Sequence, residues 1–406
     1  AASPRVSEVL VAPGNAGTAR EEGVRNCQVA ATDIDGLLAL AQREGIDLTV
    51  VGPEAPLVAG VVDAFATVGR LVFGPTRDAA RLEGSKAWAK AFMQRHGIPT
   101  ARHATFSDTT AALAYLDDHP LPVVVKADGL AAGKGVVIAE TLAGARAAVE
   151  EMLTARTFDQ AGATIVIEEF LTGEEASYIV MTDGRTVRPM ASAQDHKRAL
   201  DGDTGPNTGG MGAYSPAPVV TSTIAARIDA EVIEPVLAGF RAEGIRYRGF
   251  LYAGLMIAGD GTVRVLEFNC RFGDPECQAV LVRLESDFAE ACLKAATDRL
   301  DQVTLAWDPR PAVGVVAASA GYPGAYETGA PITGIDTADG PDVKVFEAGT
   351  ALVAGRPVTA GGRVLCVTGR GADVDAASAR AYEALGRISY DGMFYRRDIA
   401  HRALSR

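Results

Sequence analysis

The chain has 406 residues, of which 48% are hydrophobic and 22% are charged, so it can build two to four domains of roughly 150 residues each. Its 39 basic and 51 acidic side chains give a net charge of −12. This balance argues against a general nucleic-acid or membrane-surface binder, because either function favours a basic face, and we expect neither partner.

The cysteines are scattered, odd in number and without metal-site spacing, which is typical of a protein in a reducing cytoplasm: Cys27, Cys270, Cys277, Cys292 and Cys366. No apolar run approaches the ~18 residues of a membrane span. No signal peptide is visible. We expect a cytoplasmic protein that acts as a monomer.

Strands and helices alternate at the start of the chain, and this alternation predicts an open parallel α/β sheet. The strands are expected at residues 6–12, 48–51 and 71–73, and the helices at 34–44 and 58–68. Loops at the carboxyl ends of such strands form the ligand crevice, which makes residues 13–17 and 52–57 candidate substrate loops. Plain connecting loops are the alternative, since Gly and Pro are common in both.

A helix over residues 85–96, capped by Ser85, is followed by a small α+β module at 100–168. Within it, Pro122–Ile138 predicts a strand, a loop of small residues and a returning strand, with Lys126 at the strand end and Lys134 in the loop. Gly and Ala let backbone N–H groups approach an anion, and lysine supplies charge, so we interpret the hairpin as a nucleotide lid. It is not a P-loop, because no Ser or Thr follows the lysine. A glycine-rich hairpin with two solvated lysines is the alternative.

Two polar stretches follow the module. Residues 168–175 place four acids beside a strand end, as expected of a linker against an apolar ligand face or of a solvated acidic turn. Residues 194–218 predict a long polar loop, which is usually functional or disordered at this length. The embedded Met211 and Tyr214 favour an ordered loop.

Glu267 and Asn269 lie two residues apart at the end of the second strand of a hairpin predicted over 249–268. The strand period of two puts both oxygen-bearing side chains on one face. A carboxylate and an amide oxygen suit Mg²⁺, while a buried Glu–Asn hydrogen-bonded pair is the alternative. Beyond residue 304, strands at 312–318, 344–347 and 364–368 and a helix at 376–385 predict a mixed-sheet domain.

The order of these features resembles the ATP-grasp enzymes. Within them, the chain resembles the phosphoribosylamine–glycine ligases (glycinamide ribonucleotide synthetases), through the segments PGNAG, GPEAPL, EGSKA, KADGLAAGKGV, EEFLTGEEAS, QDHKR, GPNTGGMGAYSPAP and EFNCRFGDPE. The fold class expected is therefore α/β and α+β multidomain. It comprises an N-terminal open parallel α/β (pre-ATP-grasp) domain at 1–81, a central ATP-grasp domain at 82–99 and 169–303, a lid subdomain at 100–168 and a C-terminal mixed-sheet domain at 304–406.

The resemblance implies that ATP phosphorylates glycine, and that 5-phosphoribosylamine attacks the glycyl phosphate to give glycinamide ribonucleotide in de novo purine biosynthesis. ATP and Mg²⁺, with Mn²⁺ as an alternative, are the implied cofactors, and Glu267 and Asn269 the metal ligands. The implied ATP contacts are Lys86, Lys126, Gly133, Lys134, Gly135, Glu168, Glu169, Phe170, Leu171 and Glu175. The implied glycine and acyl-phosphate contacts are Arg271, Asp274, Asp195 and Lys197, and the implied phosphoribosylamine contacts are Gly14, Asn15, Ala16, Gly17, Pro53, Glu54, Gly210, Met211 and Gly212.

One departure and two rival functions stand beside this resemblance. The family has a first strand and a Gly-Gly-Arg-Glu-His loop upstream of the position of Ala1, so we expect the natural protein to extend further. Another ATP-grasp ligase or carboxylase would share the lysines and the Glu–Asn pair but not the GPNTGGMGAYSPAP loop. A non-catalytic nucleotide-binding protein is disfavoured by the intact Glu267, Asn269, Lys86 and Lys126.

Overall fold

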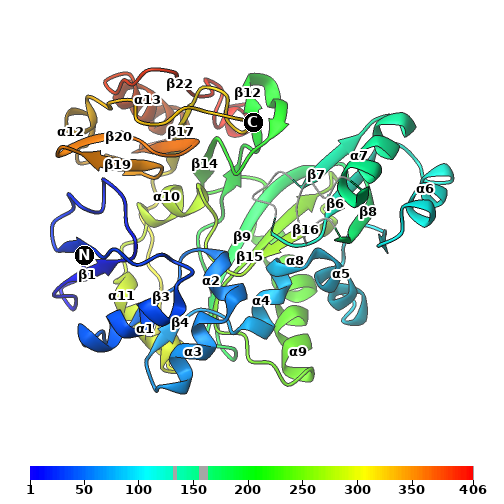
Figure 1. The fold of residues 1–406 in the computed structure, drawn as a ribbon, viewed down its shortest axis with the longest axis horizontal. Coiled ribbons are helices and arrows are strands. Elements are labelled where there is room, and N and C mark those ends of the chain that lie inside the picture. Colours follow the sequence, from blue (N-terminus) through cyan, green and yellow to red (C-terminus); the bar gives the residue numbers. More distant parts are fainter. Residues whose placement is uncertain (131–134, 155–162, 406) are drawn as a thin grey trace.

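The computed structural model describes residues 1–130, 135–154 and 163–405. Figure 1 shows the amino-terminal elements below, the carboxyl-terminal elements above and a projecting lobe that carries α6 and α7. None of the helices in the described part of the chain is both long and apolar enough to cross a membrane.

The amino-terminal strands pair in parallel, as predicted, but they form two separate two-stranded sheets and not the single open sheet that was expected. β1 (Val9–Val11) pairs with β2 (Val24–Asn26), and β3 (Thr49–Val50) pairs with β4 (Val72–Phe73). α1 (Ile34–Arg43) lies between the pairs in sequence, and the Asp33 carboxylate caps its first turn by accepting from Gly36 N–H. The sequence did not indicate β2, because its three residues alternate around the exposed Arg25 and carry little hydrophobic signal.

The single helix predicted over 58–68 is wrong. The segment forms α2 (Glu54–Ala59) and α3 (Val61–Thr67), which are separated by Gly60 at φ +93°. A left-handed backbone ends the first helix, and the apolar spacing cannot reveal such a turn because it continues across it. α2 therefore starts four residues early and places Glu54 in its first turn.

The projecting lobe is a four-stranded antiparallel sheet of order β5-β8-β6-β7 with two helices. Its core contains Val123, Val125 and Ile167 of the sheet and Leu116 and Val149 of the helices. The predicted hairpin is confirmed, because β6 pairs with β7 in antiparallel register. The elements are β5 (His103–Phe106), α6 (Thr109–Asp117), β6 (Val123–Ala127), β7 (Val136–Ala139), α7 (Leu142–Thr154) and β8 (Ile165–Glu169).

The central sheet has the order β10-β9-β15-β16, with the hairpin predicted over 249–268 at one edge. Its elements are β9 (Glu174–Thr182), β10 (Val187–Pro189), β15 (Gly249–Ile257) and β16 (Val263–Asn269). α4 (Arg77–Gly84), α5 (Lys86–Arg95), α8 (Ser222–Ile228) and α9 (Glu234–Ala242) contribute to the same core. Phe92 anchors it, with ring centroids 5.0 Å from Trp88 and 4.7 Å from Phe240.

The carboxyl-terminal sheet has the order β11-β14-β17-β21-β18, with β22 (Met393–Phe394) beside β17. β17 (Ala312–Ser319), β18 (Val343–Glu347), β21 (Arg363–Arg370) and α13 (Val374–Leu385) were predicted. The sequence did not indicate the hairpin of β19 (Thr350–Val353) and β20 (Arg356–Thr359), or the helices α10 (Glu276–Leu281), α12 (Ile335–Ala338) and α14 (His401–Leu404). α11 (Phe288–Ala296) lies between the central and carboxyl-terminal strands in the chain.

The long polar loop predicted over 194–218 is wrong as a description of this stretch. It forms β11 (Gln194–Asp195), the hairpin of β12 (Arg198–Leu200) and β13 (Thr204–Asn207), and β14 (Gly212–Ser215). β14 pairs along its length with β17, which follows much later in the chain, so Met211 and Tyr214 are buried in the carboxyl-terminal core. The strand exists because of a partner far away in sequence, which local polarity cannot indicate.

We predict that Gly60→Ala destabilises the protein by about 1–2 kcal/mol, because an L residue strains the left-handed backbone. Its Cβ would also lie 2.8 Å from the Arg77 guanidinium. Urea unfolding followed by circular dichroism measures the loss. Gly259→Ala is the control, since Gly259 is exposed and nothing lies within 4 Å of the position that a Cβ would take there. Equal stability of the two variants would contradict this account of the helix break.

Candidate active site

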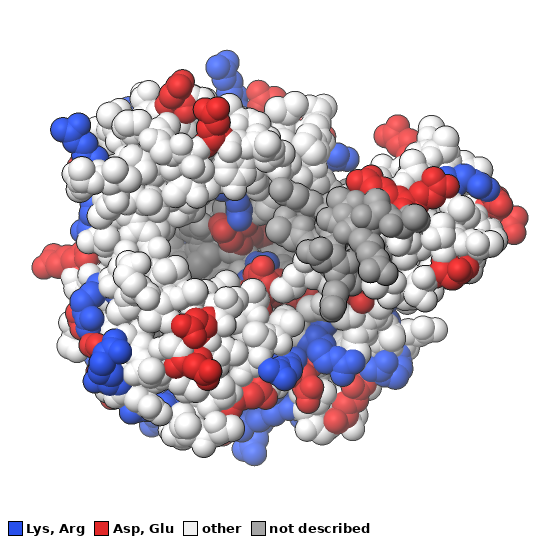
Figure 2. All heavy atoms as spheres, in the orientation of Figure 1, with Lys and Arg blue, Asp and Glu red and all other residues white. Residues whose placement is uncertain are grey.

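A cleft of about 1410 Å³ lies where the lobe, the central sheet and the carboxyl-terminal sheet meet. Figure 2 shows the hollowed face, with acidic and basic side chains inside the hollow. Most of the predicted site residues line this cleft: Pro53, Glu54, Lys86, Lys126, Gly135, Glu168, Glu169, Phe170, Leu171, Glu175, Asp195, Lys197, Glu267, Asn269, Arg271 and Asp274.

Lys86 is the first residue of α5, and this end of the helix contacts the residues that follow β6 in the lobe. Ser85 caps the helix by accepting from Trp88 N–H, and its hydroxyl donates to Asp128 at 3.1 Å. The Lys86 ammonium donates to the carbonyl oxygen of Gly129 at 2.9 Å, so it faces the start of the predicted lid loop. Burial lowers the pKa of Lys86, despite the opposing effect of Glu267. This ammonium is poorly solvated and suited to an anionic ligand.

Lys126 belongs to a buried triad that the sequence did not indicate. Glu168 accepts from Lys90 at 2.8 Å and lies 3.0 Å from the Lys126 ammonium, and all three side chains are at most one-tenth exposed. Burial alone would raise the pKa of Glu168, but Lys126 and Lys90 lower it overall. Burial lowers the pKa of Lys90 to about 8. The only available signal for Lys90 was its position one helical turn after Lys86.

Residues 169–175 run along the cleft from β8 to β9. Glu169 is partly exposed and pairs with Arg264 at 3.0 Å. The Leu171 side chain is buried, whereas Phe170 is 38% exposed, so this linker presents both backbone and an aromatic face at the cleft. Glu175 at its end lies 3.4 Å from the Lys197 ammonium.

Glu267 and Asn269 lie at the end of β16 on one face, as predicted, and both line the cleft. Lys197, at 3.1 Å, lowers the pKa of Glu267 to about 2, and Lys126 and Lys86 act in the same direction. The carboxylate is therefore ionised at neutral pH. The Asn269 amide nitrogen donates to the Phe268 carbonyl, and this hydrogen bond fixes the orientation of the amide group. An ionised carboxylate beside an oriented amide is a donor set that fits Mg²⁺ or Mn²⁺.

Arg271 follows this strand and joins three parts of the chain. Its guanidinium lies 3.1 Å from Glu54 of the amino-terminal substrate-loop candidate and 2.8 Å from Glu83 of α4. Burial raises the pKa of Glu83 to about 7, although Arg271 and the Cys270 N–H oppose this. The sequence did not indicate Glu83, because it lies in a short helix that was itself missed.

Asp195 lies close to a second carboxylate, that of Glu276. The Asp195 Oδ1 atom is inaccessible to solvent and has no hydrogen-bond partner among the described residues. Burial, reinforced by Glu276, raises the pKa of Asp195 well above its ordinary value. Glu276 is buried and accepts from Ser177 at 2.7 Å, and the Tyr252 hydroxyl lies 3.0 Å from Ser177. Glu276 was present in the EFNCRFGDPE segment, where its proximity to Asp274 was the available signal.

Several predicted residues lie elsewhere. Asn15 of the loop 14–17 donates to the backbone carbonyls of Glu347 and Ala348, so this loop packs against the carboxyl-terminal sheet instead of lining the cleft. Residues 210–212 lie immediately behind the cleft-lining Gly209, and Met211 is fully buried. Gly133 and Lys134 lie outside the described residues. Arg363, which the sequence did not indicate, lines the cleft and pairs with Asp274 at 2.7 Å.

Comparisons with known proteins agree with this architecture. Family models described as phosphoribosylglycinamide synthetase match residues 1–83 (N domain), 84–277 (ATP-grasp (A) domain) and 312–402 (C domain). The phosphoribosylamine–glycine ligase of Allochromatium vinosum is 60% identical over all 406 residues and 95% of its own length. That of Vibrio cholerae is 55% identical with the same coverage.

Solved structures give the same result. The crystal structure of phosphoribosylamine–glycine ligase from Thermotoga maritima superposes with a TM-score of 0.83 at 34% identity, covering 97% of this chain and 94% of that one. A biotin carboxylase from Campylobacter jejuni is 17% identical and superposes with a TM-score of 0.72, covering 95% of this chain and 86% of that one. This likeness shows a shared fold alone. Fold and site thus define an ATP-grasp ligase, an ATP-dependent enzyme. Within that class, the chain belongs to the phosphoribosylamine–glycine ligase family.

We predict that Glu168→Gln lowers the free energy of unfolding by about 3 kcal/mol, because it leaves two buried lysines without their shared carboxylate. Glu169→Gln, at the next residue, removes only a partly exposed pair with Arg264 and should cost less than about 1 kcal/mol. Urea unfolding at pH 7 compares the two variants. Comparable losses would show that the triad contributes no more than a surface ion pair.

Proposed function

We propose that this protein ligates glycine to 5-phosphoribosylamine, giving glycinamide ribonucleotide, ADP and phosphate, with glycyl phosphate as the intermediate. Family membership supports the overall reaction. The observation that supports the assignment of the site is that one cleft gathers the lysines of α5 and β6, the Glu267–Asn269 pair and the Arg271 guanidinium.

The chemistry requires two substitutions at one place. A carboxylate is a poor electrophile, so a glycine carboxylate oxygen first attacks the γ-phosphorus of ATP and ADP leaves. The amine of phosphoribosylamine then attacks the acyl carbon, the C–O bond to phosphate breaks, and the amine loses a proton. Phosphoryl transfer depends on positioning and charge neutralisation more than on covalent catalysis, so no nucleophilic side chain is required.

ATP is proposed to lie between the lobe and the central sheet. Lys86 and Lys126 face its phosphates, and Glu168, which lines the same cleft, holds Lys126 in place at 3.0 Å. The linker 169–171 offers its backbone to adenine, and Glu175 faces the ribose hydroxyls. The loop that contains Gly133, Lys134 and Gly135 is assigned to the ATP phosphates by resemblance alone, and a closed site keeps water from the acyl phosphate.

Glu267 and Asn269 are proposed to hold Mg²⁺, with Mn²⁺ as the alternative. When bound, such an ion neutralises charge on the transferring phosphoryl group. Lys197 now occupies the position beside Glu267, at 3.1 Å. Its long side chain also reaches Glu175, so it can serve as a cationic contact for the acyl phosphate while the carboxylate binds metal.

Glycine is proposed to bind between two opposite charges. Arg271 faces its carboxylate, and the Asp195–Glu276 carboxylates face its ammonium, since Asp195 has a buried oxygen without a partner in the described structure. An uncompensated buried carboxylate favours a cationic ligand. Asp274 holds Arg363 at the rim of this region.

Phosphoribosylamine is proposed to enter from the amino-terminal side. Glu54, with Pro53 beside it, lines the cleft and contacts Arg271, so this loop borders the glycine position. The loop 14–17 and residues 210–212 are assigned to the same substrate by resemblance. We further propose that the chain has the four domains with the boundaries given above, that it is a monomer and that it acts in the cytoplasm.

We predict that Glu267→Gln abolishes turnover, because the loss of an ionised ligand leaves phosphoryl charge unbalanced. ADP release in the presence of ATP, Mg²⁺, glycine and phosphoribosylamine measures turnover, and unchanged circular dichroism verifies folding. Glu231→Gln, on the helix surface, is the control. Near-normal activity of Glu267→Gln would refute the metal assignment. For the wild-type protein, ADP release that does not depend on both glycine and phosphoribosylamine would favour another ATP-grasp ligase. No ADP release from the wild-type protein would favour a non-catalytic nucleotide-binding protein.

We predict that the KM for glycine rises as the pH falls, because the raised pKa of Asp195 causes it to lose its charge at a higher pH than an ordinary carboxylate. Asp195→Asn should raise the KM for glycine by about tenfold or more and flatten this pH dependence, with little change in the KM for ATP. Steady-state kinetics across pH 5–8 measure both. A pH profile for Asp195→Asn that matches the wild type would remove Asp195 from the glycine site.

A further inference from the structure

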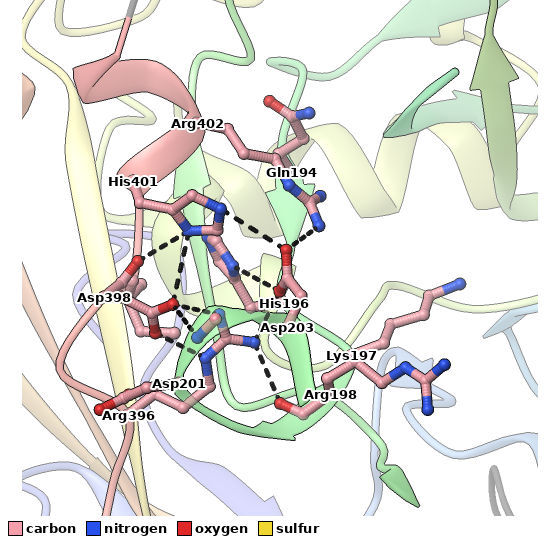
Figure 3. A network of polar contacts seen from close by, with 12 residues as sticks. Gln194, His196, Lys197, Arg198, Asp201, Asp203, Arg396, Asp398, His401 and Arg402 are labelled. Carbon is pink, nitrogen blue, oxygen red and sulfur yellow. Dashed lines mark hydrogen bonds and ion pairs between the residues drawn. The ribbon is translucent and has the colours of Figure 1, made fainter. Parts of the chain in front are cut away.

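The stretch 195–197 presents its side chains alternately to two different parts of the molecule. Asp195 and Lys197 line the cleft, whereas His196 between them is fully buried and does not line it. Figure 3 shows His196 directed toward Asp203 and His401, and Lys197 directed the other way. The extended backbone explains this arrangement, because successive side chains of a strand point to opposite faces.

The His196 side chain faces Asp203 and the carboxyl-terminal segment 396–402 (Figure 3). Asp203 and Arg402 of this group also line the cleft, whereas His196 and Arg396 do not. The imidazole Nε2 accepts from the backbone N–H of Ala400 at 2.9 Å. The proton of the neutral ring is therefore on Nδ1, which lies 3.8 Å from the Asp203 carboxylate. Burial, with Arg396 and Arg402 nearby, lowers the pKa of His196 to about 4, so the ring is neutral at pH 7.

Asp203 is the centre of an ion-pair network that spans the two segments. It lies 2.9 Å from Arg396 and 2.7 Å from Arg402. The Arg396 side chain is completely buried and also binds both oxygens of Asp398 at 2.8 Å. A buried guanidinium with two carboxylate partners fixes the relative position of the elements it joins.

Backbone groups are drawn into the same network. Arg396 donates to the carbonyl of Arg198 at 3.1 Å, and Gly202 N–H donates to Asp398 at 2.8 Å. In the reverse direction, Arg397 N–H donates to Asp201 at 2.8 Å. These bonds bracket the β12–β13 hairpin that follows Lys197.

His196, Asp203 and His401 also present ligand atoms within 4.8 Å of one another, which is a metal-like arrangement. Arg396 and Arg402 each contact a different oxygen of Asp203, so guanidinium groups already supply the positive charge that a cation would bring. We therefore interpret the cluster as an ion-pair network.

We propose that the segment 396–402 positions the catalytic segment 195–197, with His196 as the positioning residue that transmits the constraint. This inference rests on the proposed roles of Asp195 and Lys197. The Lys197 ammonium lies 3.1 Å from Glu267 and 3.4 Å from Glu175, and β11 itself is only two residues long. The His196 side chain, anchored to Ala400, holds the backbone between the two cleft-lining side chains.

The test compares His196→Leu with His196→Gln. Leucine fills similar space but cannot accept from Ala400 N–H, whereas glutamine keeps an acceptor. We expect His196→Leu to lower kcat by about tenfold or more, because small displacements of catalytic groups have large effects. The Kd of ATP, measured by calorimetry without glycine, should change less than about twofold, and His196→Gln should recover most of the activity.

A second pair separates positioning from general stability. Arg396→Met removes a buried member of the network, and Arg310→Met removes pairs with Asp308 and Asp342 elsewhere in the carboxyl-terminal part. We expect loss of kcat in folded Arg396→Met and wild-type kcat in Arg310→Met. If Arg396→Met does not fold, the comparison of His196→Leu with His196→Gln tests the proposal by itself.

Three results would overturn the proposal: unchanged kcat in His196→Leu, equal losses in both His196 variants, or a parallel loss of ATP binding and kcat. Failure of the proposed function is recognised separately. It would appear as wild-type kcat in Lys197→Met, or as wild-type protein whose ADP release does not require both substrates.

Discussion

The contact between Glu168 and its two lysines determines how the nucleotide side of the cleft is assembled. Lys90 comes from α5, Lys126 from β6 and Glu168 from β8, so one carboxylate joins the lobe to the helix at its base. Removing three charges from water costs several kcal/mol for each ion unless the partners are close and well oriented. The Lys126 ammonium also donates to the Leu266 carbonyl of β16, which brings the central sheet into the same contact. This geometry sets the direction in which the lobe faces the Glu267–Asn269 pair.

Charge is distributed across the cleft as alternating signs. Lys86 and Lys126 lie on the side of the lobe, Glu267 and Asp195 are in the middle, and Arg271 closes the side toward α2. Most of these cations lie beside an acid that holds them at a fixed distance. A site with such charges in place needs little rearrangement when anionic groups arrive, and this preorganisation is a large part of electrostatic catalysis.

Local sequence features predicted the elements whose signals are local. The Ser85 cap, the β6–β7 hairpin and the common face of Glu267 and Asn269 depend on residues within a few positions of one another, and the structure confirms all three. Features that depend on distant partners were not predictable in this way. β14 exists because it pairs with β17, and the Lys90 triad requires three elements to meet. Residue patterns proposed Lys126, the Glu267–Asn269 pair and the two strand-end loops, whereas the family resemblance supplied most of the other site residues. Neither could show that Asn15 packs against the carboxyl-terminal sheet.

The position of β14 has a consequence for how this fold can be divided. One edge of β14 pairs with β11 and the other with β17, so a strand from the middle of the chain completes the carboxyl-terminal sheet. A chain cut between residues 215 and 312 would leave an unpaired edge on both fragments, and exposed edges invite aggregation. The two parts therefore behave as interlocked pieces, and recombination between related genes would have to exchange both segments together to preserve the sheet.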